Sequence, residues 1–171
     1  LPAVPESRSF DADAPILLND GGEEITVSVQ EFLIGTAASE LPPDWPDDAV
    51  LAQMAAAHSY ALSLGGAAFT CNSAQCAGWT SAEVLRARWG GDFAAYYSRL
   101  AALADEVAGA VLCWDGAPAA ACYHSSSAGQ TEASQNVWLT AVPYLQGVAS
   151  PWDDDAPGFE TSVTYSAEQV Y

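Results

Sequence analysis

Hydrophobic residues near the start of the chain follow the alternating spacing of strands. An apolar run at 16–18 is followed by a polar turn at 19–22, and then by Ile25, Val27 and Val29, which alternate with polar positions. Alternation on either side of a Gly-rich turn is typical of a β-hairpin. We therefore expect the first regular element to be β structure.

The spacing then changes to the three-to-four-residue period of helices. Ser28 and Glu31 have the spacing of a capping box, which predicts a helix start, and Pro42 predicts that this helix ends by Leu41. Further helices are predicted where the same period lies between glycine or proline breaks. The four predicted helices cover residues 28–41, 46–64, 81–89 and 92–107.

A second hairpin is predicted around the Asp115–Gly116 turn, between apolar segments at 110–114 and 118–123. A polar stretch runs on to Asn136, and the turn-rich tail contains one segment, 161–165, with the composition of a strand. Together these elements predict an α+β fold in a single domain, with an N-terminal helical pair and antiparallel β-hairpins.

The charge balance excludes several classes of partner. The chain has 171 residues, 22 Asp and Glu, four Arg and no Lys, for a formal net charge of −18. Proteins that bind DNA, RNA or anionic membranes need clustered cations, so no nucleic acid partner is expected. Half of the residues are hydrophobic, which is enough for a core, and no apolar segment is long enough to span a membrane. Residue 1 is Leu, so we expect a mature chain trimmed of a leader or an anchor.

An even number of cysteines, four, in a small acidic chain is typical of disulfide-bonded proteins of an oxidising compartment. The alternative is that some of them are buried as free thiols. In the second hairpin Cys113 should lie opposite Pro118, which leaves Cys122 four residues out of register, at about 13 Å. That distance is too long for a disulfide. Cys71 and Cys76 are therefore the disulfide candidates, and the other two cysteines are left as thiols or for other partners.

The chain lacks the commonest catalytic motifs, namely G-x-S-x-G, a Gly-rich phosphate loop and H-E-x-x-H, and no local signature supports a Cys–His protease. Glu40 stands out instead, because it lies at a predicted helix C-terminus before the proline-rich segment 41–46, which contains Trp45. The negative end of the helix dipole and a neighbouring Trp both favour the protonated carboxyl that a general acid requires. A solvated Glu at an ordinary helix end is the alternative.

Three ordered blocks of the sequence resemble the stage II sporulation protein D family. The first comprises FLIGTAASELP at 32–42 and AVLAQMAAAHSYAL at 49–62, which are similar to the family's E-M-P and A-R-T-Y-A-L motifs. The second ends in YHSSSAGQTE at 123–132, which is similar to YHSSSGGRTE in the family. The third is Val137–Trp138 followed by VPYL at 142–145, which is similar to the family's V-W-G and P-Y-L pattern.

The resemblance implies an extracytoplasmic protein, membrane-anchored or secreted, that acts in cell-wall remodelling such as engulfment in sporulation. The blocks span about residues 25–165, which places the family domain at 25–171, truncated at both ends, after an extended segment and hairpin at 1–24. The family includes lytic transglycosylases of peptidoglycan, and a related branch enhances a wall amidase. The implied partners are therefore peptidoglycan glycan strands and a wall amidase, and the oligomeric state is left open.

The family's catalytic Glu corresponds to Glu40. The resemblance implies that Glu40 protonates the oxygen between N-acetylmuramic acid and N-acetylglucosamine and then, as carboxylate, takes the proton of the muramic C6 hydroxyl, which yields a 1,6-anhydro end. One carboxyl suffices for this reaction, whereas hydrolytic glycosidases use a pair. No cofactor is implied. The alternative is a non-catalytic wall-binding module that recruits or enhances an amidase.

The same blocks supply candidate substrate-binding residues, with hydroxyls, amides, a second acid and aromatic faces suited to sugars. They are Trp45, His58, Tyr60, Ser125, Ser126, Ser127, Gln130, Thr131, Glu132 and Trp138. His58 and Gln130 stand where the family has arginines, and neither reproduces the bidentate fork of Arg. Core packing and an ordinary polar loop are the alternatives for these residues.

Some family members hold zinc beside a cysteine pair like Cys71 and Cys76. No His lies between residues 59 and 123, so two thiolates alone would make a poor tetrahedral site. We therefore expect a Cys71–Cys76 disulfide and no metal, with zinc at this pair as the alternative.

Overall fold

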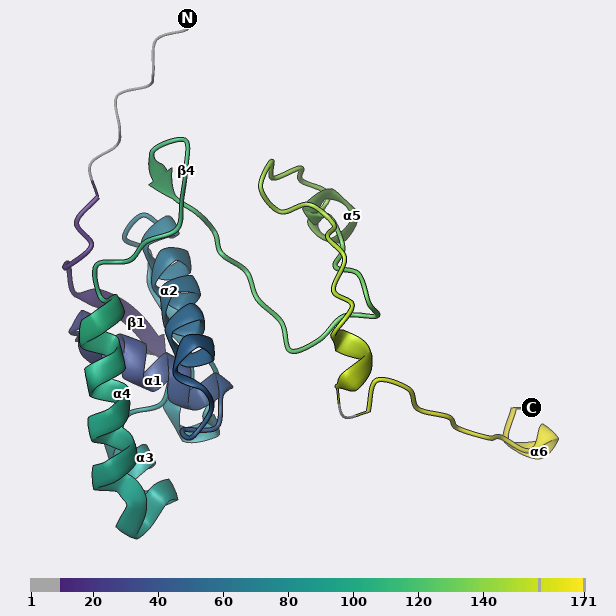
Figure 1. The fold of residues 1–171 in the computed structure, drawn as a ribbon, viewed down its shortest axis with the longest axis horizontal. Helices are drawn as coiled ribbons and strands as arrows, with labels where there is room; N and C mark the ends of the chain where they lie inside the picture. Colours follow the sequence, from purple (N-terminus) through teal and green to yellow (C-terminus); the bar gives the residue numbers. More distant parts are fainter. Residues whose placement is uncertain (1–9, 157, 171) are drawn as a thin grey trace, which may run out of the picture. The chain divides into compact units, whose positions relative to one another are not determined.

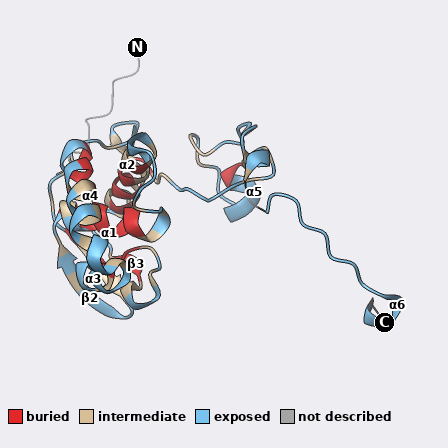
Figure 2. Cartoon of the chain, turned by 60° about the horizontal axis from the view of Figure 1, so that its bottom comes forward, coloured by how far each residue is buried: buried red, intermediate tan, exposed pale blue. Residues whose placement is uncertain are grey.

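The computed structural model describes residues 10–156 and 158–170 (Figure 1). The chain divides into two compact units, one that runs to Cys122 and one that begins at Tyr123. Buried residues gather in the first unit, whereas most residues of the second are exposed (Figure 2). The hydrophobic core of the chain is therefore a property of the first unit.

A three-stranded mixed sheet forms one part of the first unit. β1 (Ile16–Asp20) and β2 (Glu23–Val27) make the predicted antiparallel hairpin. Its turn is Gly21–Gly22, where both residues have a positive φ that side chains rarely adopt. β3 (Phe69–Cys71) adds to β1 in parallel. The sequence did not predict this parallel pairing, because three residues within a polar loop carry no strand periodicity.

The four predicted helices are confirmed. α1 (Val29–Glu40) begins with the predicted capping box, in which the Glu31 N–H donates to the Ser28 hydroxyl at 3.2 Å and the Ser28 N–H donates to the Glu31 carboxylate at 3.0 Å. The later helices are α2 (Asp47–Ser63), α3 (Ala82–Trp89) and α4 (Phe93–Val107), with a short 3-10 helix, η2 (Gly90–Asp92), before the last.

The core of the first unit is centred on α1. Residues 32–38 of this helix are all buried, which identifies it as an internal helix rather than a surface one. Phe32 meets Phe69 of β3 edge to face, with 5.2 Å between the ring centroids. Fully or almost fully buried side chains on the neighbouring elements complete the core, among them Leu18, Val50, Met54, Ala57, Leu85, Leu100 and Ala104.

Gly35 is the point of closest approach in this core. The Trp79 side chain lies on α1 there, and its indole N–H donates to the Glu31 carbonyl at 3.2 Å. A Cβ on Gly35 would lie 2.2 Å from the indole nitrogen and 2.8 Å from the Thr80 carbonyl oxygen. The Thr80 N–H in turn donates to the Gly35 carbonyl at 3.1 Å. Only a residue without a side chain permits this approach.

The second hairpin has the predicted turn and register but shorter strands. β4 (Cys113–Trp114) and β5 (Ala117–Pro118) pair antiparallel. Their Asp115–Gly116 turn has φ values of 51° and 74°, both positive as a type I′ turn requires. The hydroxyl of Ser59 in α2 accepts a hydrogen bond from the Leu112 N–H at 2.8 Å, which ties the hairpin to the helix.

The second unit is built on two segments that run antiparallel. The Thr131 N–H donates to the Val148 carbonyl at 2.9 Å, and the Ser150 N–H donates to the Gly129 carbonyl at 2.9 Å. The helical turns of this unit are α5 (Ser134–Trp138), η3 (Asp153–Asp155) and α6 (Ala167–Val170).

The α+β class is confirmed, as are the α1–α2 pair and the antiparallel hairpins, although the main sheet is mixed. The predicted strand at 161–165 is wrong, because these residues are exposed and have no strand partner. Within residues 10–156 and 158–170, no helix is long and apolar enough to cross a membrane.

Gly35→Ala should lower the free energy of unfolding by about 1–3 kcal/mol, the usual cost of overpacking. The new methyl group must displace the indole of Trp79 or the backbone of Thr80, and a gain in helix propensity of at most about 1 kcal/mol does not offset this strain. Urea unfolding followed by circular dichroism measures the difference. Gly91→Ala is the matched control, because a Cβ there has no neighbour within 4 Å. Equal stability of the two variants would show that the Gly35 contact is not tight in solution.

Candidate functional site

Glu40 is the last residue of α1 and is exposed, although the helix that carries it is buried along most of its length. No hydrogen bond or ion pair to its carboxyl is present among the residues that the structure describes. The side chain is therefore accessible to a ligand and is not committed to an internal contact.

Arg99 of α4 holds the connection that follows Glu40. Its guanidinium donates to the carbonyls of Pro43 and Trp45, both at 2.5 Å, and also to the Asp47 carboxylate. A planar fork of donors can serve several acceptors at once in this way. The Trp45 side chain remains 46% exposed while its backbone is held, so it presents an aromatic face at a fixed position.

A second group of contacts holds the C-terminal turn of α1. The Arg88 guanidinium donates to the Ala38 carbonyl at 3.0 Å, one of the carbonyls that a helix end leaves without an internal partner. The Ser39 and Thr80 hydroxyls hydrogen-bond to each other at 2.8 Å, and Ser39 also donates to the Gly35 carbonyl at 2.9 Å. The backbone that positions Glu40 is thus tied to α3 and to the segment before it.

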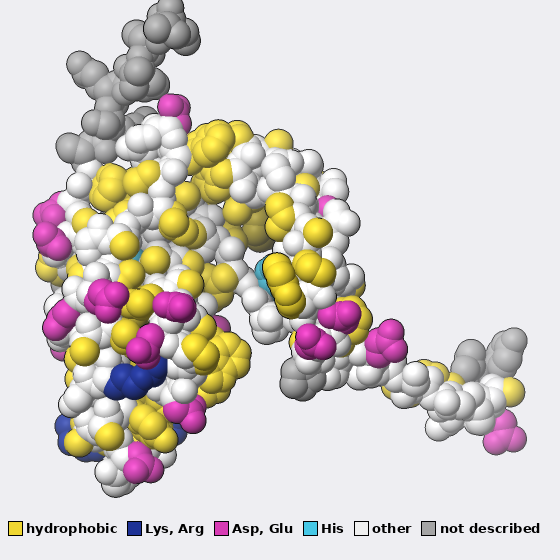
Figure 3. All heavy atoms as spheres, in the orientation of Figure 1, with side chains coloured by type: hydrophobic (Ala, Val, Ile, Leu, Met, Phe, Trp, Pro, Cys, Tyr) yellow, Lys and Arg dark blue, Asp and Glu magenta, His cyan; other side chains and the backbone are white. Residues whose placement is uncertain are grey.

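Sequence reasoning did not identify Arg88 and Arg99 as supports of this site. Figure 3 shows acidic side chains spread over the visible face of the first unit, with few basic ones among them. Arg86 of α3 does not contact the connection, because its guanidinium lies over the Phe93 ring, 4.1 Å from the ring centroid. One feature of the sequence could have pointed to Arg88 and Arg99, namely the scarcity of cations. In a chain this acidic, each Arg is a candidate for a specific structural contact.

His58 and Tyr60 lie on α2 and differ in burial. His58 is predicted to bind substrate, and the structure places it in the core with no exposed area. Burial lowers the pKa of His58, and the Ala12 backbone and the Asp13 charge oppose this effect only in part. Tyr60 is half-buried and packs edge to face on Phe69, with 6.2 Å between the ring centroids.

The remaining predicted binding residues lie in the second unit, and several of them make structural contacts. The Thr131 hydroxyl accepts a hydrogen bond from the Val148 N–H at 2.9 Å. The Glu132 carboxylate accepts from the Asn136 amide and from the Ala133 N–H, both at 2.7 Å, and these bonds lower the pKa of Glu132. Those side chains stabilise the turn into α5.

Other candidates of the second unit face solvent. Ser125, Ser126 and Gln130 are exposed, and Trp138 is 55% exposed at the end of α5. Ser127 is half-buried. The predicted residues therefore form two groups in separate units, one around Glu40 and Trp45 and the other along 125–138.

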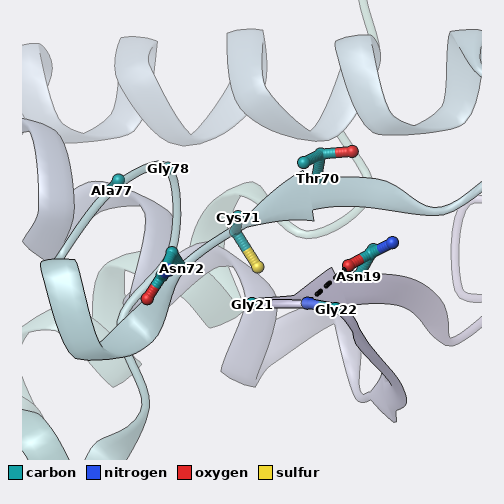
Figure 4. Close-up of a pocket in the computed structure, with 8 residues that line it drawn as sticks. All are labelled: Asn19, Gly21, Gly22, Thr70, Cys71, Asn72, Ala77 and Gly78. Atoms are coloured by element: carbon teal, nitrogen blue, oxygen red, sulfur yellow. Dashed lines mark hydrogen bonds between the residues drawn. The ribbon is translucent and has the colours of Figure 1, made fainter.

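Cys71 lines a cavity of about 510 Å³ between the β1–β2 turn and the loop after β3. In Figure 4 the Cys71 sulfur is directed toward the Gly21–Gly22 turn, which the Asn19 side chain braces by accepting the Gly22 N–H at 3.0 Å. Burial, together with the Asp20 charge, raises the pKa of the Cys71 thiol to about 11, so it stays protonated at neutral pH.

All four cysteines are free thiols, so the structure does not contain the predicted Cys71–Cys76 disulfide. A protonated thiol reacts slowly with oxidants, because the thiolate is the reactive form. The part of the chain that the structure describes has no group of three or more His, Cys, Asp or Glu side chains placed to hold a metal ion. These residues do not fit the zinc site considered as the alternative.

Comparison with known proteins gives a consistent set of relatives. The family profile described as "Stage II sporulation protein" matches residues 22–114, more than half of the chain. Stage II sporulation protein D of Bacillus amyloliquefaciens is 26% identical over 180 residues, which cover 98% of this chain and 51% of that protein. Stage II sporulation protein D of Bacillus subtilis (strain 168) is 30% identical over 159 residues, which cover 84% of this chain and 44% of that protein.

A third relative has a different name. The amidase enhancer of Bacillus subtilis (strain 168) is 30% identical over 139 residues, which cover 81% of this chain and 17% of that protein. The chain spans about half the length of the two stage II sporulation proteins D.

Arg99→Lys should loosen the 41–46 connection although it keeps the charge, because one ammonium cannot replace the forked donors to the Pro43 and Trp45 carbonyls. We expect a loss of about 1–2 kcal/mol in stability and faster hydrogen exchange at the Trp45 amide. Asp47→Asn is the control, since it removes only a solvent-screened ion pair worth at most about 1 kcal/mol. Equal exchange rates in the two variants would contradict the clamp.

His58 should make the first unit less stable in mild acid. Its folded pKa lies below the value of about 6.5 for an unfolded His, so the unfolded chain binds the extra proton as the pH falls through that range. The free energy of unfolding should therefore decrease as the pH falls through about 6.5, the ordinary pKa of His. His58→Met should flatten this slope, because it removes the titrating group. An unchanged slope in His58→Met would refute the assignment.

Proposed function

The chain belongs to the stage II sporulation protein D family, and we propose that it is a lytic transglycosylase that cuts peptidoglycan glycan strands outside the cytoplasm, anchored or secreted, during cell-wall remodelling such as that of sporulation. The bond cut is the one from N-acetylmuramic acid to N-acetylglucosamine. The observation that carries the proposal is the exposed Glu40 carboxyl at the end of a buried helix, next to a connection that Arg99 holds in place.

Glu40 acts as acid and then as base in this mechanism. The carboxylic acid donates its proton to the glycosidic oxygen as the bond from that oxygen to the muramic C1 breaks, and N-acetylglucosamine leaves with a free hydroxyl. The Glu40 carboxylate then takes the proton of the muramic C6 hydroxyl while the C6 oxygen bonds to C1. The enzyme ends in its starting state with the 1,6-anhydro product, so no water and no second carboxyl are required.

The surroundings of Glu40 suit this role. A carboxyl without an internal partner can approach a substrate oxygen without first breaking a contact. The fixed backbone on both sides of Glu40 supports the precise placement that proton transfer needs. Trp45, half exposed in the same connection, offers an apolar face for a sugar ring. In the second unit, the exposed Ser125, Ser126 and Trp138 are the further candidates for sugar contacts.

The second candidate function is a non-catalytic wall-binding module that recruits or enhances an amidase. The likeness to the amidase enhancer, which covers 81% of this chain, favours it. The cations of the described region also favour it, because Arg86, Arg88 and Arg99 are each engaged within the protein and His58 is buried. A site without a free cation can bind a sugar by hydroxyls and aromatic faces alone.

Glu40→Gln should reduce glycan cleavage by at least about a hundredfold, because it removes the group that donates and accepts the proton. Stability should change by less than about 0.5 kcal/mol, since the side chain is exposed. Mass spectrometry of products from purified peptidoglycan measures the 1,6-anhydro ends. Asp44→Asn, an exposed acid of the same connection, is the matched control and should cleave normally.

Two outcomes would contradict this proposal, the first in its catalytic residue and the second in its activity. If Glu40→Gln released anhydro products at the rate of the unmodified chain, Glu40 would not be the catalytic residue. If the unmodified chain bound glycan strands but never cut them, the recruitment module would be the correct function.

A further inference from the structure

The serine-rich loop 125–127 of the second unit is hydrogen-bonded to the side chain of Asp153, 26 residues later in the sequence. The Ser127 N–H donates to the Asp153 carboxylate at 2.8 Å, and the Ser127 hydroxyl donates to the same oxygen. Ser125 and Ser126 differ from Ser127, because both are exposed and neither hydroxyl has a hydrogen-bond partner within the described parts of the chain. The three serines of this loop therefore divide into one that is held and two that are available.

Asp153 lies just beyond the point where the backbone ladder of the second unit ends. The ladder between the two antiparallel segments includes the bond from the Ser150 N–H to the Gly129 carbonyl. After Ser150 the chain turns into η3, so the backbone pairing does not continue toward Ser127. The side chain of Asp153 takes over at this point and accepts the Ser127 N–H that the ladder leaves without a partner.

Asp153 is itself fixed by the short 3-10 helix η3. Its N–H donates to the Ser150 carbonyl at 3.2 Å, and its carbonyl accepts from the Ala156 N–H at 3.0 Å. Because both ends of the contact are tied to the same ladder, the loop and the acid are held as one piece.

We propose that Asp153 is a positioning residue for glycan binding, which fixes the loop 125–127 so that the hydroxyls of Ser125 and Ser126 point at a neutral sugar bearing hydroxyl and N-acetyl groups. The choice of ligand rests on the proposed function, whereas the contact between Asp153 and Ser127 does not. Ser127 is then a structural member of the loop rather than a ligand of the sugar.

The charge of Asp153 strengthens this contact, since hydrogen bonds to an ionised acceptor are about twice as strong as neutral ones. The hydroxyl and then the N–H of Ser127 lower the pKa of Asp153, and the Ser150 hydroxyl and the His124 charge lower it further. The other charged groups of this turn are the neighbouring acids Asp154 and Asp155. The hold on the loop is therefore complete at neutral pH and is lost only as the pH falls through a value below about 3.9, the ordinary pKa of Asp.

The Ser127 amide gives a readout that is independent of activity. In ¹H–¹⁵N spectra of the 171-residue chain, its proton should titrate with a midpoint below the ordinary Asp value. Asp153→Asn should abolish that titration, whereas the matched controls Asp154→Asn and Asp155→Asn should keep it. A Ser127 amide that does not titrate, or that titrates unchanged in Asp153→Asn, would overturn the proposal.

Binding of soluble glycan strands without stem peptides tests the role in recognition. Asp153→Asn should raise Kd about tenfold, the equivalent of one charged hydrogen bond, and the two control variants should bind within about twofold of the unmodified chain. Where cleavage is measured, KM should rise with Kd while kcat changes by less than about twofold. Unchanged Kd in an Asp153→Asn variant that has lost the amide titration would overturn the positioning role. Failure of the unmodified chain to bind glycan would instead refute the proposed function, and the amide titration would still decide the contact.

Discussion

The close approach of Trp79 to Gly35 is the contact on which the rest of the first unit depends. Because α1 has no side chain at that position, the segment before α3 can lie directly on the helix and donate a backbone hydrogen bond to the Gly35 carbonyl. That placement brings Thr80 within reach of Ser39. It also starts α3 where Arg88 can reach the last turn of α1. A glycine five residues before Glu40 thus controls how firmly the backbone of Glu40 is held.

The three arginines in the described part of the chain make structural contacts. Arg88 completes the end of α1, Arg99 holds the connection to α2, and Arg86 covers an aromatic ring. The chain has a net charge of −18, so carboxylates are abundant partners for an arginine. Arg88 and Arg99 nevertheless donate to backbone carbonyls. Carbonyls at a helix end and in a proline-rich turn lack internal partners, so the arginines satisfy groups that the local sequence cannot.

The elements with strong local signals were predictable and those set by distant partners were not. The capping box at Ser28 and the Asp115–Gly116 turn are fixed by neighbouring residues, and both form as predicted. The pairing of β3 with β1 and the burial of His58 depend on tertiary packing, to which a short loop or a lone polar residue gives no clue. The same limit applies to the site, where the position of Glu40 at a helix C-terminus could be predicted but the side chains that support it could not. The Cys71–Cys76 disulfide was inferred by excluding the other pair and a zinc site, and neither step carries information on the burial of Cys71.

The excess of acid also bears on how this domain would recognise a glycan. A surface with net charge −18 repels the carboxylates of stem peptides, and the described arginines are already engaged. Recognition must therefore rest on the uncharged sugar, through hydroxyl groups and aromatic faces. Gln130 in place of a family Arg fits this mode, because an exposed amide can bind an N-acetyl group without attracting an anion. Under the proposed function, this chain would select for the sugar backbone where a relative with free arginines would also hold its charged substituents.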